Sequence, residues 1–192
     1  MKTIADAQQD MREAYCGGAP GVVSSATAWF LAAMVALLAS PFAGVLTLIF
    51  GGMLIFPVSV LLCKIMGRSG KHSKNNPLAP LAIEGTIWML ISIPVAVAAA
   101  MFKIEWFFPA MLVVISGRYL TFCTLYGMRI YWLFGAALLL ASASMIAIEA
   151  PVFLGAFAGS LVEFVFGAII FFTRKTQQLN SSLKTDTASG LG

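Results

Sequence analysis

Six long runs of apolar residues dominate the chain, and short polar segments separate them. Each run is close to the ~20 residues that an α-helix needs to cross a hydrocarbon core of about 30 Å. No stretch alternates apolar and polar residues in the ~10-residue units of an outer-membrane barrel, so helices are the structure that satisfies the backbone in lipid. The pattern predicts spans over residues 21–39, 42–63, 81–101, 107–126, 128–148 and 151–172.

The connections on one side of these spans are short. Residues 40–41, 103–106 and 149–151 link the first span to the second, the third to the fourth, and the fifth to the sixth. Turns this tight place consecutive helices side by side and antiparallel. We therefore predict an all-α membrane protein whose six transmembrane helices form three antiparallel hairpins, within a single bundle domain over residues 1–172.

The two ends of the chain differ from the spans. Within residues 1–20, positions 3–15 carry apolar side chains at helical spacing and are otherwise polar and acidic, which predicts a short interfacial helix packed on the protein's own basic loops. A Gly-rich corner around Gly17 and Gly18 then breaks this helix before the first span. Residues 173–192 are polar and rich in Ser and Thr, which predicts a flexible tail.

Composition and charge place the chain in a membrane. Only 10% of its 192 residues are charged and 60% are hydrophobic, whereas a soluble domain has about 25% charged residues. Asp6, Asp10 and Glu13 stand where a cleavable signal peptide would be basic and then apolar, so we expect a cytoplasmic N-terminus. Eleven of the 12 basic residues then lie on the cytoplasmic side, a strong positive-inside bias with only Lys103 outside. The net charge of +4 therefore reflects topology and contact with anionic lipid, not nucleic-acid binding.

Small residues and one proline shape the predicted helices. Small residues recur at four-residue spacing in the first and sixth spans, which lets neighbouring helices approach closely. We interpret these stripes as packing surfaces within the bundle, with a homo-oligomer interface as the alternative. Pro57 predicts a kink in the second span. The stripe residues are Ser24, Ala28, Ala32, Gly155, Gly159 and Gly167.

Three charged residues fall well inside predicted spans, namely Glu84, Arg118 and Glu163. A charge near the bilayer centre costs on the order of 2.5 to 3.5 kcal/mol on insertion scales and usually has a partner or a function. Two carboxyl groups and one guanidinium predict that Arg118 pairs with one acid while the other takes up a proton, and Glu163 is the deeper acid. Trp88 lies one turn from Glu84, and Tyr126 lies at the membrane level of Arg118. These five residues are the candidate ligand- or proton-binding site.

A structural interpretation of the same residues is the alternative, because buried charges can serve only to fix helix packing. Tyr119 and Tyr131 are assigned to the aromatic belt at the membrane interface, where tyrosine is enriched. Arg129 is assigned to a helix end.

The other reactive side chains argue against most classes of enzyme. His72, in the basic loop of residues 64–80, is the only histidine, which excludes bis-histidine haem ligation and an HExxH zinc site. Ser24 and Ser25 have no histidine or lysine in the spans to activate them. A phosphate-binding loop and a dinucleotide fingerprint are both missing. We expect no enzyme activity, no bound metal and no cofactor.

Three segments carry a resemblance to a known family. YCGGAPG at residues 15–21, GKHSKNNPLAPLAIEGTIW at 70–88 and GRYLTFCTLYGMRIYW at 117–132 resemble a family of small bacterial membrane proteins of unknown function. The resemblance runs from about residue 10 to residue 172. It implies a helical bundle in the bacterial inner membrane, and it supplies no activity or substrate. With six spans, the expected cytoplasmic N-terminus places the C-terminus in the cytoplasm as well.

The leading functional hypothesis is a small inner-membrane transporter or ligand-binding protein with a cytoplasm-facing Glu/Arg pocket linked to a proton. Its expected partners are membrane lipids and a small anionic ligand or a proton. The alternative is a non-catalytic scaffold or partner-binding protein, and an enzyme acting on lipid is the third hypothesis.

Overall fold

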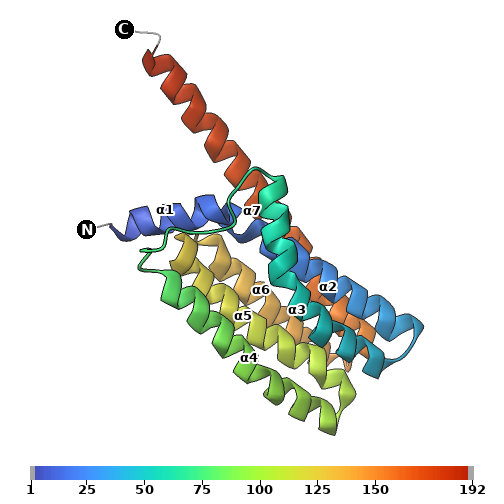
Figure 1. Cartoon of the computed structure of the whole chain (residues 1–192). Coiled ribbons are helices and arrows are strands. Elements are labelled where there is room, and N and C mark those ends of the chain that lie inside the picture. Colours follow the sequence, from blue (N-terminus) through green and yellow to red (C-terminus); the bar gives the residue numbers. More distant parts are fainter. Residues whose placement is uncertain (1–2, 190–192) are drawn as a thin grey trace.

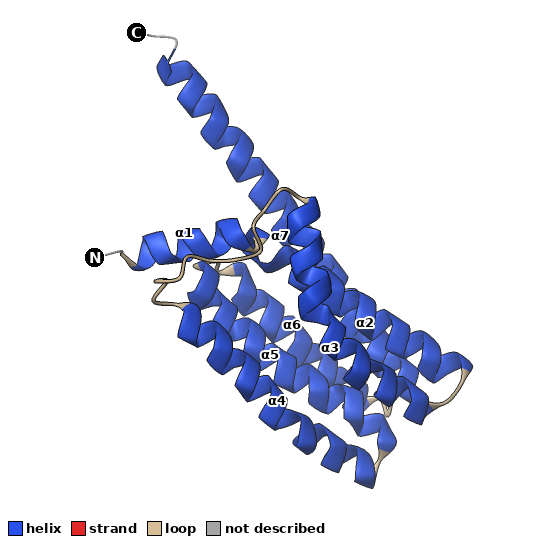
Figure 2. Cartoon of the chain, viewed as in Figure 1, coloured by secondary structure: helices blue, strands red, loops and turns tan. Residues whose placement is uncertain are grey.

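The computed structural model describes residues 3–189 of the chain, with side chains described up to residue 173. This part of the chain is almost entirely helical and contains no strand (Figures 1 and 2). Two 3₁₀ turns, η1 (Cys16–Gly18) and η2 (Ile104–Trp106), join longer helices. The helices are α1 (Ile4–Ala14), α2 (Ala19–Leu38), α3 (Pro41–Ile65), α4 (Ala79–Phe102), α5 (Phe107–Tyr126), α6 (Ile130–Ala147) and α7 (Val152–Ser189).

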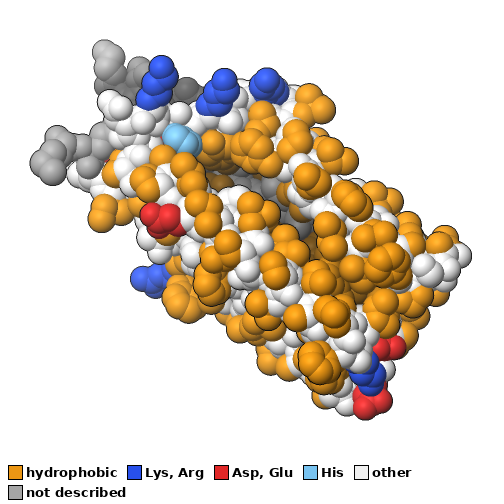
Figure 3. Space-filling view, turned by 60° about the horizontal axis from the view of Figure 1, so that its bottom comes forward, with side chains coloured by type: hydrophobic (Ala, Val, Ile, Leu, Met, Phe, Trp, Pro, Cys, Tyr) orange, Lys and Arg blue, Asp and Glu red, His pale blue; other side chains and the backbone are white. Residues whose placement is uncertain are grey.

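Six helical segments of the described chain are long and apolar enough to cross a membrane. They are Cys16–Leu38, Pro41–Ile65, Ala79–Phe102, Ile104–Tyr126, Ile130–Ala147 and Val152–Thr173. Hydrophobic side chains cover most of the face seen in Figure 3, and basic side chains gather at one end of it. Both observations confirm the prediction of an all-α, multi-pass membrane protein with six spans. We call the end of the bundle that carries α1 the α1 end.

Local sequence signals set where the spans begin and end. Pro41 fits the first turn of α3, where a backbone N–H would have no partner, and the hydroxyl of Ser40 accepts a hydrogen bond from the backbone N–H of Ala43 at 3.1 Å. Gly127 ends α5 in a left-handed conformation with φ of 63°, which glycine adopts without strain. These residues therefore keep the α2–α3 turn and the α5–α6 connection short.

The packing joins the predicted hairpins into one bundle. Helices α2 and α3, α4 and α5, and α6 and α7 are neighbours, as the short turns require. The helix α2 also packs extensively on α7, and α5 packs on α6, so contacts between hairpins are as large as those within them. In contrast, α3 and α4 are joined by residues 66–78 and make no extensive contact with each other (Figure 1).

The second half of α3 is mostly uncovered, until Cys63 near its end is buried again. Val45 and Leu48 are buried near its start, but none of residues 49–62 is buried. Pro57 lies inside this half, where it removes a backbone hydrogen bond, and Figure 1 shows that α3 is bent. A hollow is visible in the middle of the face in Figure 3.

The small-residue stripes lie at helix contacts within the chain. A Cβ atom on Gly159 would approach Trp29 of α2 to 2.6 Å, and one on Gly155 would approach Phe108 of α5 to 3.1 Å. Gly167 is equally close to α2, at 3.1 Å from Val23. On the stripe of α2, Ala28 and Ala32 face α3, while the hydroxyl of Ser24 bonds to the carbonyl of Pro20. The glycines of α7 are therefore covered by α2 and α5.

Helix α1 packs on the loop between α3 and α4. Thr3 and Asp6 form a reciprocal capping box at its first turn, which explains why the helix begins there. The carboxylate of Asp10 accepts hydrogen bonds from the hydroxyl of Ser73 at 2.8 Å and from the amide of Asn76 at 2.6 Å. The amide of Asn76 also donates to the carbonyl of Ala7 at 2.9 Å. The predicted N-terminal helix is thus present, and it holds the loop of residues 66–78 against the bundle.

Replacing Asp10 by alanine should loosen this loop. The change removes the hydrogen bonds that the Asp10 carboxylate accepts. A hydrogen bond to a charged group contributes about 1.5 to 3 kcal/mol to the free energy of unfolding. We expect a lower melting temperature in detergent and faster tryptic cleavage at Arg68, Lys71 and Lys74. Glu13→Ala is the control, because Glu13 is exposed on the same helix. Equal cleavage rates in the two variants would show that Asp10 does not hold the loop.

The C-terminal segment continues the last span. Helix α7 runs to Ser189 and projects beyond the bundle (Figure 1), and the flexibility of the segment from residue 173 stays a prediction. Apart from Ser and Thr, residues 174–184 are mainly Arg, Lys, Gln and Leu, which favour helix, and no proline or glycine interrupts them. The prediction for residues 190–192 lies outside the described part of the chain.

Candidate functional site

A buried carboxyl group occupies the centre of the bundle. Glu163 lies near the middle of the span Val152–Thr173, and its side chain is 0% exposed. Its Oε1 atom accepts two hydrogen bonds, from the hydroxyl of Ser25 at 2.9 Å and from the phenol of Tyr119 at 2.7 Å. Its Oε2 atom has no hydrogen-bond partner among the described residues. One oxygen of the carboxyl group is therefore fixed, and the other is open to a proton or a cation.

Three helices build this site. The close approach of α7 to α2 at Gly159 and Gly167 brings Glu163 beside Ser25, which is 7% exposed. Helix α5 supplies Tyr119 from the other side, and this side chain is 5% exposed. A carboxylate removed from water in this way costs several kcal/mol unless a cation or a proton neutralises it. Two neutral hydroxyl donors stabilise it only in part.

Buried tyrosines connect this site to the α1 end. The ring of Tyr119 stacks on that of Tyr131 with 6.2 Å between centroids, and Tyr131 stacks on Tyr126 at 5.8 Å. The hydroxyl of Tyr131 donates to the backbone carbonyl of Gly17 at 2.6 Å. Gly17 lies in the η1 corner, whose next residue, Gly18, has φ of 91° and leaves room for Tyr131 and Tyr126. A column of phenol groups thus leads from Glu163 to this corner.

Arg118 occupies a different side of α5. Its Nη1 atom lies 3.4 Å from the sulfur of Met89 on α4, and its guanidinium lies 5.6 Å from the centroid of the Phe122 ring. Among the described side chains, no carboxylate lies within salt-bridge distance of it. The predicted ion pair between Arg118 and a glutamate is therefore not formed. The reason is geometric: Tyr119 faces Glu163, and the preceding residue on a helix points about 100° away.

The remaining candidate residues do not converge on Glu163. Glu84 is exposed on α4, and Trp88, one turn further along, is 56% exposed. The indole nitrogen of Trp88 lies 3.6 Å from the position of a Cβ on Gly117, so this ring borders α5 near Arg118. Tyr126 is buried in the tyrosine column. The five predicted residues are thus divided among a carboxyl site, an arginine site and the outer face of α4.

Three residues of the carboxyl site and the tyrosine column, namely Ser25, Tyr119 and Tyr131, were missed by the sequence interpretation. Tyr119 and Tyr131 were assigned to the membrane interface, but they are 5% and 0% exposed and lie within the bundle. The signal for Tyr119 is its spacing: with Leu112 and Tyr126 it repeats every seven residues, which keeps the three on one helix face. Ser25 has no comparable signal, because the sequence does not distinguish it from its neighbour Ser24 as the hydrogen-bond donor to Glu163.

At the α1 end, Tyr15 links the corner to the loop. Its ring lies 6.1 Å from that of His72, with a tilt of 57° between the planes. Burial raises the pKa of the Tyr15 phenol above its ordinary value, so this group stays neutral at physiological pH. Within the described side chains, no cluster of three or more His, Cys, Asp or Glu could hold a metal ion.

Comparisons with known proteins give a family and no activity. Neither the search of curated proteins nor the search of solved structures finds a match. A family model described as a family of unknown function, DUF7010, matches residues 4–173, which include all six spans and the carboxyl site. The chain therefore belongs to the family of unknown function DUF7010.

Proposed function

We propose that this protein is a small membrane transporter that binds a proton at Glu163 and a small anion at Arg118. The observation that carries the proposal is the carboxyl group of Glu163, which is fully buried in the bundle centre with Oε2 unpartnered. An ionisable residue inside a membrane span marks proton or substrate pathways in many transporters. Substrate and coupling-ion sites near the bilayer midplane are also usual for transporters.

The separation of the two charges supports this assignment. Glu163 contacts α5 through Tyr119, whereas Arg118 extends from a different side of α5 towards Met89 of α4. The two residues form no ion pair with each other. Glu163 is fully buried and Arg118 is partly buried, so each charge then needs its own neutralising group. A proton serves this purpose for the carboxylate, and an anion that accepts charge-assisted hydrogen bonds serves it for the guanidinium. Binding both together leaves the total charge of the bundle unchanged.

We infer a separate route to each site. The tyrosine column of residues 119, 131 and 126 connects Glu163 with the η1 corner at the α1 end. Arg118 lies on the α4-facing side of α5, and α4 makes no extensive contact with α3. We place the α1 end in the cytoplasm of a bacterial cell, because the basic residues gather there and the positive-inside rule favours that side.

Binding of anions to the purified protein tests the arginine site. The experiment follows the melting temperature in neutral detergent with acetate, lactate, benzoate, nitrate and inorganic phosphate at pH 5.5 and pH 8. We expect at least one of these anions to stabilise the wild type, more strongly at pH 5.5. Arg118→Gln should weaken its binding at least about tenfold, because hydrogen bonds to a charged group are worth about 1.5 to 3 kcal/mol.

Arg129→Gln is the matched control, since Arg129 is exposed at the start of α6. It should bind the same anion as tightly as the wild type. Equal weakening by both variants would mean that the anions act on surface charge alone, and the arginine site would be rejected. No stabilisation by any of the five anions would favour the alternative scaffold role.

A further inference from the structure

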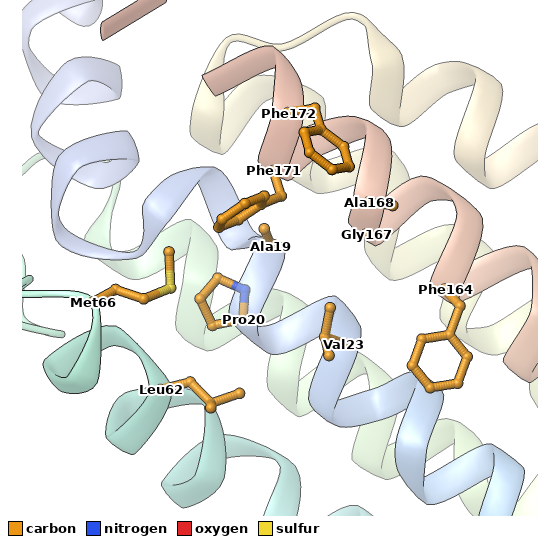
Figure 4. A pocket seen from close by; sticks show the side chains of 10 residues that line it. All are labelled: Ala19, Pro20, Val23, Leu62, Met66, Phe164, Gly167, Ala168, Phe171 and Phe172. Atoms are coloured by element: carbon orange, nitrogen blue, oxygen red, sulfur yellow. The ribbon is translucent and has the colours of Figure 1, made fainter. Parts of the chain in front are cut away.

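An apolar groove lies between α3 and α7 on the outside of the bundle, with α2 as its floor (Figure 4). Its volume is about 350 Å³. Leu62 and Met66 form the α3 wall, and Phe164, Ala168 and Phe171 form part of the α7 wall. The groove exists because α3 packs on α2 but makes little contact with α7.

The groove follows the membrane-spanning part of α7 towards the α1 end. Phe164, Ala168 and Phe171 recur at intervals of four and three residues, so they share one helix face. The same spacing places positions 174 and 175 on the continuation of this face, because α7 remains helical to Ser189. These positions are Arg174 and Lys175. The apolar groove therefore leads to a pair of basic positions at the membrane surface.

This combination fits a phospholipid better than a protein helix. The volume lies at the lower end of the ~300–1,000 Å³ of small-molecule sites, which suits one acyl chain. Two turns of an α-helix about 10 Å across with its side chains need more than twice that space. Basic residues beside a span also attract anionic headgroups.

We propose that this groove binds one acyl chain of an anionic phospholipid, whose headgroup lies against positions 174 and 175. The lipid fills the space between α3 and α7 and holds the bent half of α3 in place. Because it rests on neither Glu163 nor Arg118, this site is independent of the proposed transport function.

Native mass spectrometry of the full chain in neutral detergent tests the site with phosphatidylglycerol and phosphatidylcholine of identical acyl chains. We expect one phosphatidylglycerol molecule to bind more tightly than phosphatidylcholine. Arg174→Gln combined with Lys175→Gln should lower the affinity for phosphatidylglycerol at least about tenfold. Each basic residue near an anionic headgroup raises the affinity roughly fivefold. Lys103→Gln is the control, because Lys103 follows α4 at the end of the bundle opposite to the loop of residues 66–78. It should change the affinity less than twofold, since the charge lies more than a Debye length away.

Ala168→Phe tests the acyl-chain part of the same site. Ala168 is exposed in the groove, so phenylalanine should fill the groove and abolish the tight binding of either lipid. Ala136→Phe, at an exposed position on α6, is the matched control. Equal affinity of the wild type for the two lipids, or unchanged binding by Ala168→Phe, would overturn the proposal. A dimer that Ala168→Phe disrupts would also overturn it, because a second copy would then occupy the groove.

Discussion

Glutamine in place of Glu163 should abolish the proton uptake that accompanies anion binding. Glutamine has nearly the same shape, and its carbonyl oxygen can still accept the hydrogen bonds from Ser25 and Tyr119. It cannot gain or lose a proton in the physiological range. The variant should therefore fold about as well as the wild type, because the ionisable group is gone but an amide NH2 takes the unpartnered Oε2 position. A single substitution thus removes proton binding at this site while the stability of the protein is kept.

The pH dependence of anion binding gives the clearest measurement. Proton and anion binding are linked reciprocally, so a proton that favours the anion makes the anion bind more tightly as the pH falls. For the anion that stabilises the wild type, we expect affinity to be stronger at pH 5.5 than at pH 8. Glu163→Gln should bind that anion with nearly the same affinity at both values. Isothermal titration in two buffers of different ionisation enthalpy measures the protons taken up.

Glu149→Gln is the control for this experiment. Glu149 lies in the turn before α7, where its side chain is 79% exposed and forms a surface ion pair with Lys103. Surface ion pairs contribute only about 0–1 kcal/mol, so this variant should retain proton uptake and stability. Retained proton uptake in Glu163→Gln would refute the carboxyl site. Loss of stability in Glu163→Gln, with no change in proton binding, would support a purely structural role.

The spans and the depth of Glu163 could be predicted because both depend on local composition. A run of about 20 apolar residues identifies a spanning helix whatever its neighbours are. The glycines around Glu163 also indicate that this face of α7 contacts protein. Neither inference requires knowledge of which helix lies opposite.

The partners of the charged residues could not be predicted, because they depend on contacts between distant helices. The number of charges in the spans predicted an ion pair between Arg118 and a glutamate. The orientation of α5 about its axis instead directs Tyr119 towards Glu163. Glu84 then lies on the outer face of α4. The contact of α2 with α7 joins the first and last spans, and no local pattern in either span specifies it.

Alanine at position 44 should destabilise the bundle, whereas alanine at position 52 should not, although both glycines lie in α3. A Cβ on Gly44 would lie 2.5 Å from the Cβ of Ala36 and 2.9 Å from the carbonyl oxygen of Ala32. Since the backbone of α2 has to move, we expect the free energy of unfolding to fall by about 1 to 3 kcal/mol. Around Gly52 no atom lies within 4 Å of the added Cβ.

Gly52→Ala should therefore leave the stability unchanged or raise it by up to about 1 kcal/mol, because alanine favours helix over glycine. Melting temperatures of the two variants are measured in the same detergent. Gly44→Ala should lower the melting temperature and Gly52→Ala should not, so the order of the two variants does not depend on which detergent is used. Equal effects of the two substitutions would mean that α2 and α3 are not in close contact at Gly44. The bend of α3 would then begin nearer its start than Pro57, and the groove between α3 and α7 would be wider than its lining residues imply.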